Sequence, residues 1–409
     1  MKKVFRKFVA LFFLLVLIIA TINVPSALAK QNQKTTEASI AKSTQDKKIV
    51  VQDWLIVPIF YATNRLSLDT NDTVSYSEEA NPKGLSFGVK NFAVPSPFNS
   101  PVDEATQTKM GWQRMHALAK KHADAPEFDK AKCNVQDKVL SRNEIVPTFE
   151  GYRERTGSSD NIIYVHGCCA GFETVMRRAA MVASHTQAPV LVYDWVSPKG
   201  FQKYLVNEVM IDQTIDDFCK FLTKVETIMD PKNITFIGHS MGAELVDKAM
   251  VRRAELIKVN PAMSKFKEVI MSNADVDAIS FLKHGKEFAL NGEKTRIYFS
   301  TTDKRLRLST FVHGGYRRLG SPGTLISDLV KIDGAECIDI TANNTGHDLP
   351  YWLVANMHKY NNVGPVKGFD LKPTSGGYLL LVRTPGTPQE ISEAPSKCIC
   401  HPIASLVTK

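Results

Sequence analysis

The chain has 409 residues, 44% of them hydrophobic, so it is long enough to bury the core of one large domain or of two smaller ones. Its formal net charge is +9, but four of these charges belong to the N-terminal segment considered next, which leaves +5. Such a small excess over so long a chain excludes a strongly basic surface. We therefore expect no nucleic-acid partner.

The N-terminus has the three regions of a secretory signal peptide. Four basic residues within positions 2–7 precede an apolar run over 8–20, and Ala27-Leu28-Ala29 supplies a small-x-small cleavage site. An uncleaved membrane anchor is the alternative, because the apolar segment approaches spanning length. The cleavage site favours removal, so we expect an exported protein, periplasmic or secreted, with no stable membrane span after cleavage. Residues 1–29 would be the signal peptide, and the polar residues 30–48 a flexible lead-in.

The chain has seven cysteines, an odd number that leaves at least one unpaired if the others form disulfides after export. Cys398 and Cys400, together with Cys133, could join peripheral segments of the chain. The spacing of Cys and His residues fits no zinc motif, and we expect neither a metal nor a cofactor.

The first part of the chain gives few signals of regular structure. We expect a strand over 54–62, with Pro58 indicating a sheet edge, then a polar loop over 70–83 and a second strand over 85–94. Residues 95–160 are mixed in pattern, with a helix favoured over 106–121.

From residue 161 short apolar runs alternate with helical patterns, which is typical of a mostly parallel sheet covered by helices on both faces. The sequence therefore predicts an α/β fold with a central sheet of about eight strands in a domain over 49–360. The expected strands are 161–165, 189–194, 234–237, 269–272, 296–300 and 336–340, and the expected helices are 172–184, 203–229, 244–257 and 349–359. Residues 361–409 form a C-terminal extension with one strand candidate at 378–382.

The predicted helix over 203–229 carries an apolar stripe at helical spacing, opposite a side rich in carboxylates. Its members are Leu205, Val209, Phe218, Leu222, Val225 and Met229.

The most informative stretch is Gly238-His239-Ser240-Met241-Gly242, which lies between the strand predicted at 234–237 and a helix-forming segment. A Gly-x-Ser-x-Gly pattern is weak alone, but between a strand and a helix it predicts a sharp turn that exposes the serine hydroxyl. Ser240 is therefore the candidate nucleophile, and the chain must supply a base, an acid and an oxyanion hole.

An oxyanion hole needs two backbone N–H groups, one of them following the nucleophile. Met241 supplies the first. His166-Gly167-Cys168-Cys169 follows the strand at 161–165, and Cys168 is the best candidate for the second donor. For the adjacent thiols we favour a role as small buried apolar groups over a redox role.

The base and the acid are chosen by chain order, because each should follow a strand end. His347 follows the last predicted strand, with His313 and His358 as less favoured alternatives. Asp303 follows the strand at 296–300.

Asp275 and Asp277, which follow the preceding strand, are the alternative acids, and Asp339 lies within a strand and is less well placed. The order Ser240, Asp303, His347 is the one expected of an α/β-hydrolase.

The chain resembles the α/β-hydrolase family, and within it the bacterial group of uncharacterised esterase/lipase-like proteins called DUF900. The resemblance covers roughly residues 50–360 and implies Ser240, Asp303 and His347 as nucleophile, acid and base. The matching segments are 56–65, 163–167, 193–197 with Tyr204 and Asp212, 236–242, 274–281, 298–320 and the surroundings of His347.

The chain departs from the family pattern at two places. Cys168 and Cys169 stand where the family usually has an aromatic residue and an asparagine. The segment Asp194-Trp195-Val196-Ser197 lacks the proline that usually follows the tryptophan. Both segments belong to the expected acyl pocket, so the resemblance does not extend to substrate preference.

The sequence thus predicts an exported serine hydrolase that acts on a small-molecule or lipid-like ester through an acyl-enzyme. The alternatives are an acyltransferase with the same three residues, or a secreted binding protein on a hydrolase scaffold. Four arginines after Asp303 could bind an acidic substrate group, although an ion-paired or solvated surface is favoured for them: Arg305, Arg307, Arg317 and Arg318.

Overall fold

The structure is a computed structural model that describes residues 54–68, 75–95, 138–186, 188–343, 346–350, 369–383 and 401–403. The chain divides into two units, Met1–Val51 and Gln52–Lys409, and all described residues belong to the second. The predicted signal peptide and lead-in, the helix at 106–121 and most of the helix at 349–359 lie outside the described residues. So do His358, Cys133, Cys398 and Cys400.

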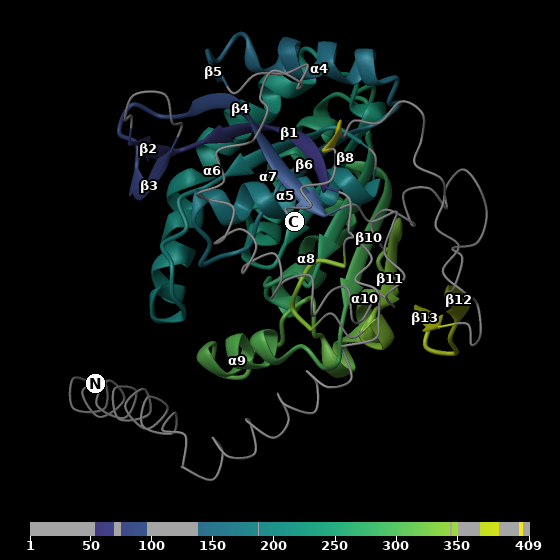
Figure 1. Cartoon of the computed structure of the whole chain (residues 1–409). Coiled ribbons are helices and arrows are strands. Elements are labelled where there is room, and N and C mark those ends of the chain that lie inside the picture. The colour runs from purple at the N-terminus through teal and green to yellow at the C-terminus, as the bar shows by residue number, and fades with distance from the viewer. Residues whose placement is uncertain are drawn as a thin grey trace, which may run out of the picture. The chain divides into compact units, whose positions relative to one another are not determined.

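The described unit is built on a twelve-stranded sheet in the order β12-β13-β11-β10-β9-β8-β6-β7-β1-β4-β5, with β14 also paired to β1 (Figure 1). Its strands are β1 (Trp54–Thr63), β4 (Ser86–Pro95), β5 (Lys138–Leu140), β6 (Asn161–Val165), β7 (Val190–Asp194), β8 (Ile234–His239), β9 (Phe266–Ser272), β10 (Gly292–Phe299), β11 (Ala335–Asp339), β12 (Phe369–Pro373), β13 (Leu379–Arg383) and β14 (His401–Ile403).

Neighbouring strands are parallel from β13 through to β1, which makes a parallel centre of eight strands. The strands β4, β5, β12 and β14 are added antiparallel around this centre. The predicted α/β architecture is confirmed, and the whole sheet is larger than the expected eight strands because of these additions. The strand candidate at 378–382 corresponds to β13.

The α-helices among the described residues are α4 (Ile145–Thr156), α5 (Phe172–Thr186), α6 (Tyr204–Glu226), α7 (Met241–Val259), α8 (Ala278–Ala289), α9 (Lys304–Val312) and α10 (Ile326–Leu329). The chain passes from β6 to β7 in one direction along the sheet and from β7 to β8, β9 and β10 in the other. Because such crossovers are right-handed, α5 covers one face, while α6, α7 and α8 cover the opposite face. In agreement, α7 packs between α6 and α8.

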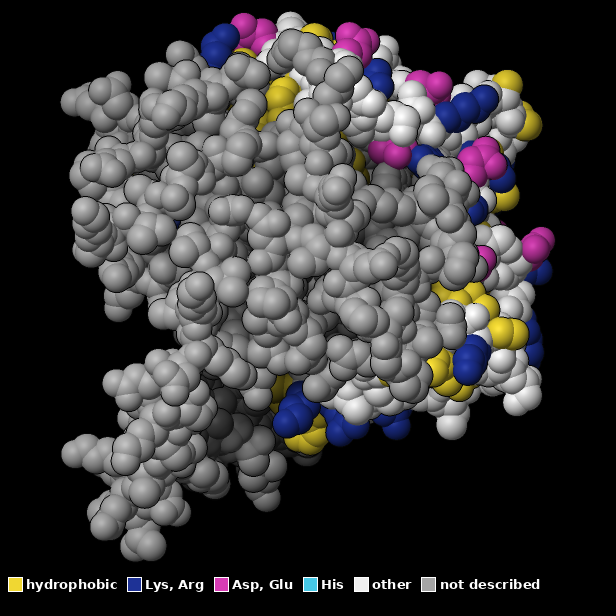
Figure 2. All heavy atoms as spheres, turned by 45° about the vertical axis from the view of Figure 1, so that its right-hand side comes forward, with side chains coloured by type: hydrophobic (Ala, Val, Ile, Leu, Met, Phe, Trp, Pro, Cys, Tyr) yellow, Lys and Arg dark blue, Asp and Glu magenta, His cyan; other side chains and the backbone are white. Residues whose placement is uncertain are grey.

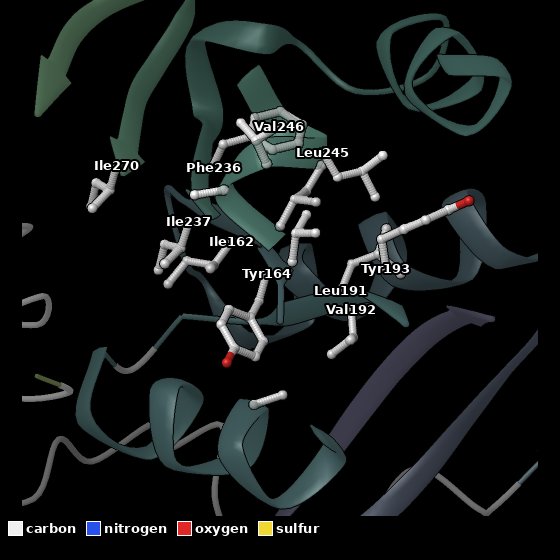
Figure 3. Packing of buried hydrophobic residues seen from close by; sticks show 14 of the residues in the cluster. Ile162, Tyr164, Leu191, Val192, Tyr193, Phe236, Ile237, Leu245, Val246 and Ile270 are labelled. Atoms are coloured by element: carbon white, nitrogen blue, oxygen red, sulfur yellow. The ribbon is translucent and has the colours of Figure 1, made fainter. Parts of the chain in front are cut away.

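The core lies between the central strands and these helices. Every residue of β6, β7 and β8 is buried, as expected for parallel strands covered on both faces, and this explains why they appear in the sequence as continuous apolar runs. Figure 3 shows the side chains of Ile162, Leu191, Phe236 and Ile237 among those of neighbouring strands and of α7. The buried strands place the loops at their carboxyl ends on a rigid base.

Two strand predictions near the N-terminus were wrong. Pro58 does not mark an edge strand, because β1 pairs with β4 along its whole length and with β14 and β7 on its other side. The pairs with β14 end at Ile56 and those with β7 begin at Phe60, so Pro58 falls where that side has no partner among the described strands. The polar segment 70–83 contains β3 (Tyr76–Ala80), which pairs with β2 (Arg65–Ser67) in a small second sheet.

The apolar stripe predicted for α6 is correct only in its second half. Phe218 and Leu222 are buried, whereas Leu205 and Val209 are each 52% exposed. The first turns instead bury Tyr204 and Asn207, which donate hydrogen bonds to Asp275 and to the carbonyl of Pro198 in neighbouring loops.

The described surface mixes charges of both signs. Figure 2 shows Lys and Arg side chains interspersed with Asp and Glu over the described part of one face. Among the described residues, none of the helices is both long and apolar enough for a membrane crossing.

Candidate active site

Ser240 lies at the turn between β8 and α7 with a positive φ of 55°, a conformation that a residue with a side chain rarely adopts. A Cβ on Gly242 would lie 2.1 Å from the carbonyl oxygen of His166, and a Cβ on Gly238 would lie 2.9 Å from Cα of Ala243. Both glycines of the motif are therefore required by the close approach of helix and strands. The predicted sharp turn is present, with Ser240 at its apex.

The structure brings Ser240, His347 and Asp303 together, as the sequence predicted. The distance from Ser240 Oγ to His347 Nε2 is 2.8 Å, and the distance from His347 Nδ1 to Asp303 Oδ2 is 2.7 Å. These contacts fit the tautomer in which Ser240 donates to Nε2 and Nδ1–H donates to the carboxylate. The Asp303 side chain is fully buried, whereas that of His347 is 10% exposed.

Asp303 is positioned by the start of α9. Its Oδ1 accepts hydrogen bonds from the backbone N–H groups of Arg305 and Leu306, each at 3.0 Å, so it caps the helix while Oδ2 faces His347. Burial raises the pKa of Asp303, but the hydrogen bond and charge of His347 outweigh it and hold the pKa below the usual value. The carboxylate is thus kept ionised beside the imidazole.

Two supporting residues were missed by the sequence analysis. Asn273 Nδ2 donates to Asp303 Oδ2 at 3.1 Å and to the carbonyl of Gly346 at 3.2 Å, so it connects the acid to the loop that carries His347. His239 Nε2 donates to the carbonyl of His347 at 2.9 Å, and burial lowers the pKa of His239 well below its usual value. Asn273 directly follows β9 and adopts a positive φ of 46°. The position of Asn273 directly after a predicted strand was the feature of the sequence that could have identified it.

The candidate oxyanion loop lies directly against the nucleophile. A Cβ on Gly167 would be 2.7 Å from Ser240 Cβ, so only glycine permits this contact. The N–H of Cys169 donates to Ser197 Oγ at 2.6 Å, while that of Cys168 has no acceptor within the described part of the chain. Met241 is the first residue of α7, so its N–H has no partner inside the helix. Neither of the two predicted donors therefore has a hydrogen-bond acceptor among the described residues.

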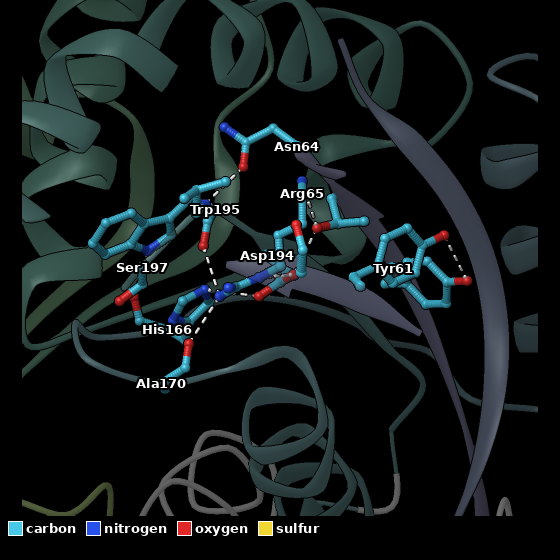
Figure 4. Close-up of polar contacts among 12 residues, drawn as sticks. Tyr61, Asn64, Arg65, His166, Ala170, Asp194, Trp195 and Ser197 are labelled. Atoms are coloured by element: carbon cyan, nitrogen blue, oxygen red, sulfur yellow. Dashed lines mark hydrogen bonds and ion pairs between the residues drawn. The ribbon is translucent and has the colours of Figure 1, made fainter. Parts of the chain in front are cut away.

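A buried charged network supports this loop (Figure 4). Arg65 Nε lies 2.8 Å from Asp194 Oδ2, and His166 Nε2 lies 3.1 Å from Asp194 Oδ1, with all three side chains fully buried. Arg65 also donates to the carbonyls of Ala170 and Trp195 at 2.8 and 3.0 Å. The network thereby joins both ends of the oxyanion loop to the start of β2 and the end of β7.

Burial disfavours the charge on Asp194, but Arg65 and His166 outweigh it and hold the pKa of Asp194 at about 2. Burial likewise lowers the pKa of His166, against the hydrogen bond and charge of Asp194, which raise it. Arg65 and Asp194 lie within the matching segments 56–65 and 193–197, but the sequence alone gave no reason to pair them.

The alternative acids have other partners. Asp275 pairs with Arg318 at 2.7 Å and accepts hydrogen bonds from Tyr204 and Ser309, each at 2.6 Å. Asp277 caps α8 through the N–H of Ser280.

Asp339 accepts from the backbone N–H of Thr341, and the alternative base His313 pairs with Glu208. Of the four arginines after Asp303, Arg318 is ion-paired and buried, and Arg305 is exposed. Among the described residues no group of three or more His, Cys, Asp or Glu is arranged to hold a metal ion.

The parallel sheet, the strained serine turn and the neighbouring histidine and aspartate define an α/β hydrolase. The family described as “Alpha/beta hydrolase of unknown function (DUF900)” matches residues 153–356, and the chain is similar to this family over that region. The resemblance inferred from the sequence motifs is therefore confirmed.

Similar solved structures include the HSL-homolog EstE7 from a metagenome library, which is 13% identical with a TM-score of 0.29 over 50% of this chain and 78% of that chain. An esterase of Pyrobaculum calidifontis is 15% identical with a TM-score of 0.21, over 44% and 56% of the two chains. An arylesterase is 12% identical with a TM-score of 0.25, over 64% and 99%. Comparison with curated proteins found no match.

Proposed function

We propose that this protein is a serine hydrolase that cleaves carboxylic esters through an acyl-enzyme. The observation that supports this most directly is the continuous hydrogen-bonded chain from Asp303 through His347 to Ser240. This arrangement lets an imidazole remove the serine proton while a buried carboxylate stabilises the resulting cation.

In the first half-reaction His347 accepts the proton of Ser240 as Oγ attacks the ester carbonyl carbon. The negative charge that develops on the carbonyl oxygen is stabilised by the N–H groups of Cys168 and Met241. Loss of one such donor costs roughly 10²–10³-fold in rate in comparable sites. His347 then protonates the leaving alcohol, which leaves the acyl group on Ser240.

In the second half-reaction a water molecule gives its proton to His347 and attacks the acyl carbonyl. The carboxylic acid is released and the proton returns to Ser240. This sequence requires no redox step and uses only groups that the described site contains.

The test is labelling of the mature protein with a fluorophosphonate probe, which reacts rapidly only with an activated serine. Ser240→Ala is expected to abolish labelling and the hydrolysis of nitrophenyl esters while leaving the circular dichroism spectrum unchanged. Ser327→Ala, which changes an exposed serine in α10, is the matched control and should label like the wild type. A well-folded wild-type protein that neither labels nor hydrolyses any ester in an acyl-chain series would contradict the proposal.

We also propose that the protein is exported, on the strength of the basic, apolar and small-x-small regions of residues 1–29. N-terminal sequencing of the protein recovered from the periplasm or the medium should find Lys30 as its first residue. An N-terminus at Met1 in the recovered protein would refute the predicted cleavage.

A further inference from the structure

The oxyanion loop contains two adjacent thiols that the proposed reaction does not use. Cys168 Sγ and Cys169 Sγ lie 2.8 Å apart, within hydrogen-bond distance, and both side chains are only partly buried. Cys169 has a positive φ of 65°, one of three such non-glycine residues in the described chain, together with Ser240 and Asn273. Both of those other residues belong to the active site, so the backbone at Cys169 is constrained in the same region.

The peptide between the two cysteines is part of the oxyanion loop. Gly167, immediately before the pair, touches Ser240, and the N–H of Cys168 is a proposed oxyanion donor. The N–H of Cys169 is fixed by its 2.6 Å hydrogen bond to Ser197 Oγ. A covalent change at the sulfurs would therefore act on the backbone that positions the donor.

The pKa values of the two thiols are shifted in opposite directions. The neighbouring thiol of Cys168 lowers the pKa of Cys169, and the guanidinium of Arg305 lowers it further, while burial and the carboxylate of Asp275 oppose this. The hydrogen bond with Cys169 raises the pKa of Cys168, and burial adds to that effect. Because the thiolate is the nucleophile in thiol–disulfide exchange, Cys169 is the sulfur that reacts first.

We propose that Cys168 and Cys169 form a reversible modification site, at which oxidation by a small-molecule disulfide joins the two sulfurs and disables the oxyanion hole. The Cys169 thiolate attacks one sulfur of the oxidant, which releases its other half as a thiol and leaves a mixed disulfide. Cys168 then loses its proton and attacks Cys169 Sγ, which releases the second half as a thiol. One disulfide bond is formed and one is broken, and the two electrons pass to the oxidant.

Geometry explains why this bond would be both disruptive and reversible. Cα atoms joined by a trans peptide are about 3.8 Å apart, whereas disulfides ordinarily span roughly 4.4–6.8 Å between Cα atoms. A bond between neighbouring cysteines must therefore distort the Cys168–Cys169 backbone, including the N–H groups beside Ser240. Strained disulfides are also the more easily reduced ones, so a thiol should reverse the change.

The test of the bond itself is peptide mapping, which does not depend on the proposed activity. Trypsin cleaves after Arg155 and Arg177, and residues 156–177 contain Cys168 and Cys169 but no other cysteine. The full mature chain is treated with glutathione disulfide, alkylated with iodoacetamide and digested. We expect this peptide to lack both alkyl groups and to be lighter by two hydrogen atoms, and to carry two alkyl groups when dithiothreitol is added before alkylation.

Control of the site is measured as the rate of fluorophosphonate labelling, an arm that rests on the proposed function. Oxidation should slow labelling on the order of 10²-fold, as for loss of one oxyanion donor, and dithiothreitol should restore it. Cys169→Ser should make labelling insensitive to the oxidant. Cys219→Ser, which removes a thiol from α6, should retain the full response.

Two results would overturn the inference. One is a peptide over 156–177 that remains doubly alkylated after treatment with glutathione disulfide, or that is found joined to another peptide. The other is a complete internal disulfide with an unchanged labelling rate, which would remove its control over the site. If reduced wild-type protein does not label at all, the proposed function fails, but the peptide map still decides whether the disulfide forms.

Discussion

Asp303 divides its two carboxylate oxygens between a helix and a histidine. Oδ1 caps α9, and Oδ2 contacts His347 and Asn273. The same residue that begins the helix therefore fixes the orientation of the imidazole, so that helix capping and catalytic geometry depend on one rotamer. Because Oδ1 makes the cap and Oδ2 faces His347, a substitution that keeps the cap can separate the two contributions.

Asp303→Asn should preserve folding but remove activity. Asparagine caps helices about as well as aspartate, so the start of α9 should persist. An amide opposite Nδ1 favours the wrong imidazole tautomer, and we expect kcat for a nitrophenyl ester to fall by about 10⁴-fold. Asp277→Asn, which makes the equivalent change at the cap of α8, should keep wild-type kcat. Equal activity in the two variants would exclude Asp303 as the acid.

At this scale the sequence could select the three proposed catalytic residues but not explain the selection. Asp275 and Asp277 also follow a strand end, and only the structure shows that Asp303 contacts His347, whereas Asp275 pairs with Arg318 and Asp277 only caps α8. The partner of Asp275 could not be identified from the sequence, because Arg318 lies 43 residues further along the chain.

At the scale of the elements, α9 is held over the site by a buried polar cluster. Tyr204 donates to Asp275 at 2.6 Å and lies 2.9 Å from Ser309 on α9, and Ser309 also donates to Asp275. The backbone N–H of Asp275 in turn donates to the carbonyl of Ser240. The cluster thus connects α6 and α9 with the serine turn.

Tyr204→Phe should therefore lower activity as well as stability. Removing the hydroxyl deletes a hydrogen bond to a carboxylate, worth about 1.5–3 kcal/mol, and loosens the helix that carries Asp303. Because small misplacements of catalytic groups are costly, we expect kcat to fall by a few-fold to about 10²-fold. The measurements are steady-state kinetics and urea unfolding.

Tyr193→Phe is the matched control for this variant. It removes a buried tyrosine hydroxyl that lies 3.2 Å from Thr214, away from the cluster around Asp275. It should affect the free energy of unfolding but leave kcat unchanged. An equal loss of kcat in both variants would show that destabilisation alone, and not the position of α9, determines the effect.

Buried elements were predicted more accurately than exposed ones. The central strands β6, β7 and β8 are covered on both faces and were predicted because continuous apolar runs admit few other structures. The strand β3 has a polar sequence and an exposed end, so its pairing with β2 left no hydrophobic pattern. The first half of α6 failed for the converse reason, because its contacts are polar and its apolar residues Leu205 and Val209 face outward.

At the scale of the whole described unit, the candidate site depends on residues that range from Arg65 on β2 to His347 beyond β11. The parallel centre of the sheet could be predicted because each of its strands has a recognisable apolar pattern in its own local sequence. The pairing of β14 with β1 and the ion pair of Arg65 with Asp194 could not be predicted, because each joins residues more than a hundred positions apart. The conformation of the oxyanion loop therefore depends on contacts made by the assembled sheet, and its own sequence does not determine it.

Asp194→Asn should destabilise the protein strongly, because it leaves the fully buried Arg65 without its counter-charge. Breaking a buried pair in this way costs about 3–5 kcal/mol. A milder variant, Thr63→Val, removes one hydrogen bond to the same carboxylate and should cost about 1.5–3 kcal/mol. In contrast, Asp216→Asn breaks the exposed pair with Arg252 and should change little. Urea unfolding of the four proteins compares them, and similar stabilities for all would refute the structural role of the network.

The same network determines how stability responds to acid. The folded-state pKa of Asp194 is about 2, below the usual value near 3.8, so its contribution is present above about pH 4 and is lost as pH falls towards 2. A difference of this size corresponds to about 2 kcal/mol, and Asp303, whose pKa is also lowered, acts in the same direction. The double variant Arg65→Met/Asp194→Asn removes both charges of the pair and so avoids leaving one unpaired. Its free energy of unfolding, measured with urea between pH 5 and pH 2, should fall by about 2 kcal/mol less than that of the wild type. If the free energy of unfolding fell equally with pH in the two proteins, the titration of Asp194 would not be coupled to folding, despite its short distance to Arg65.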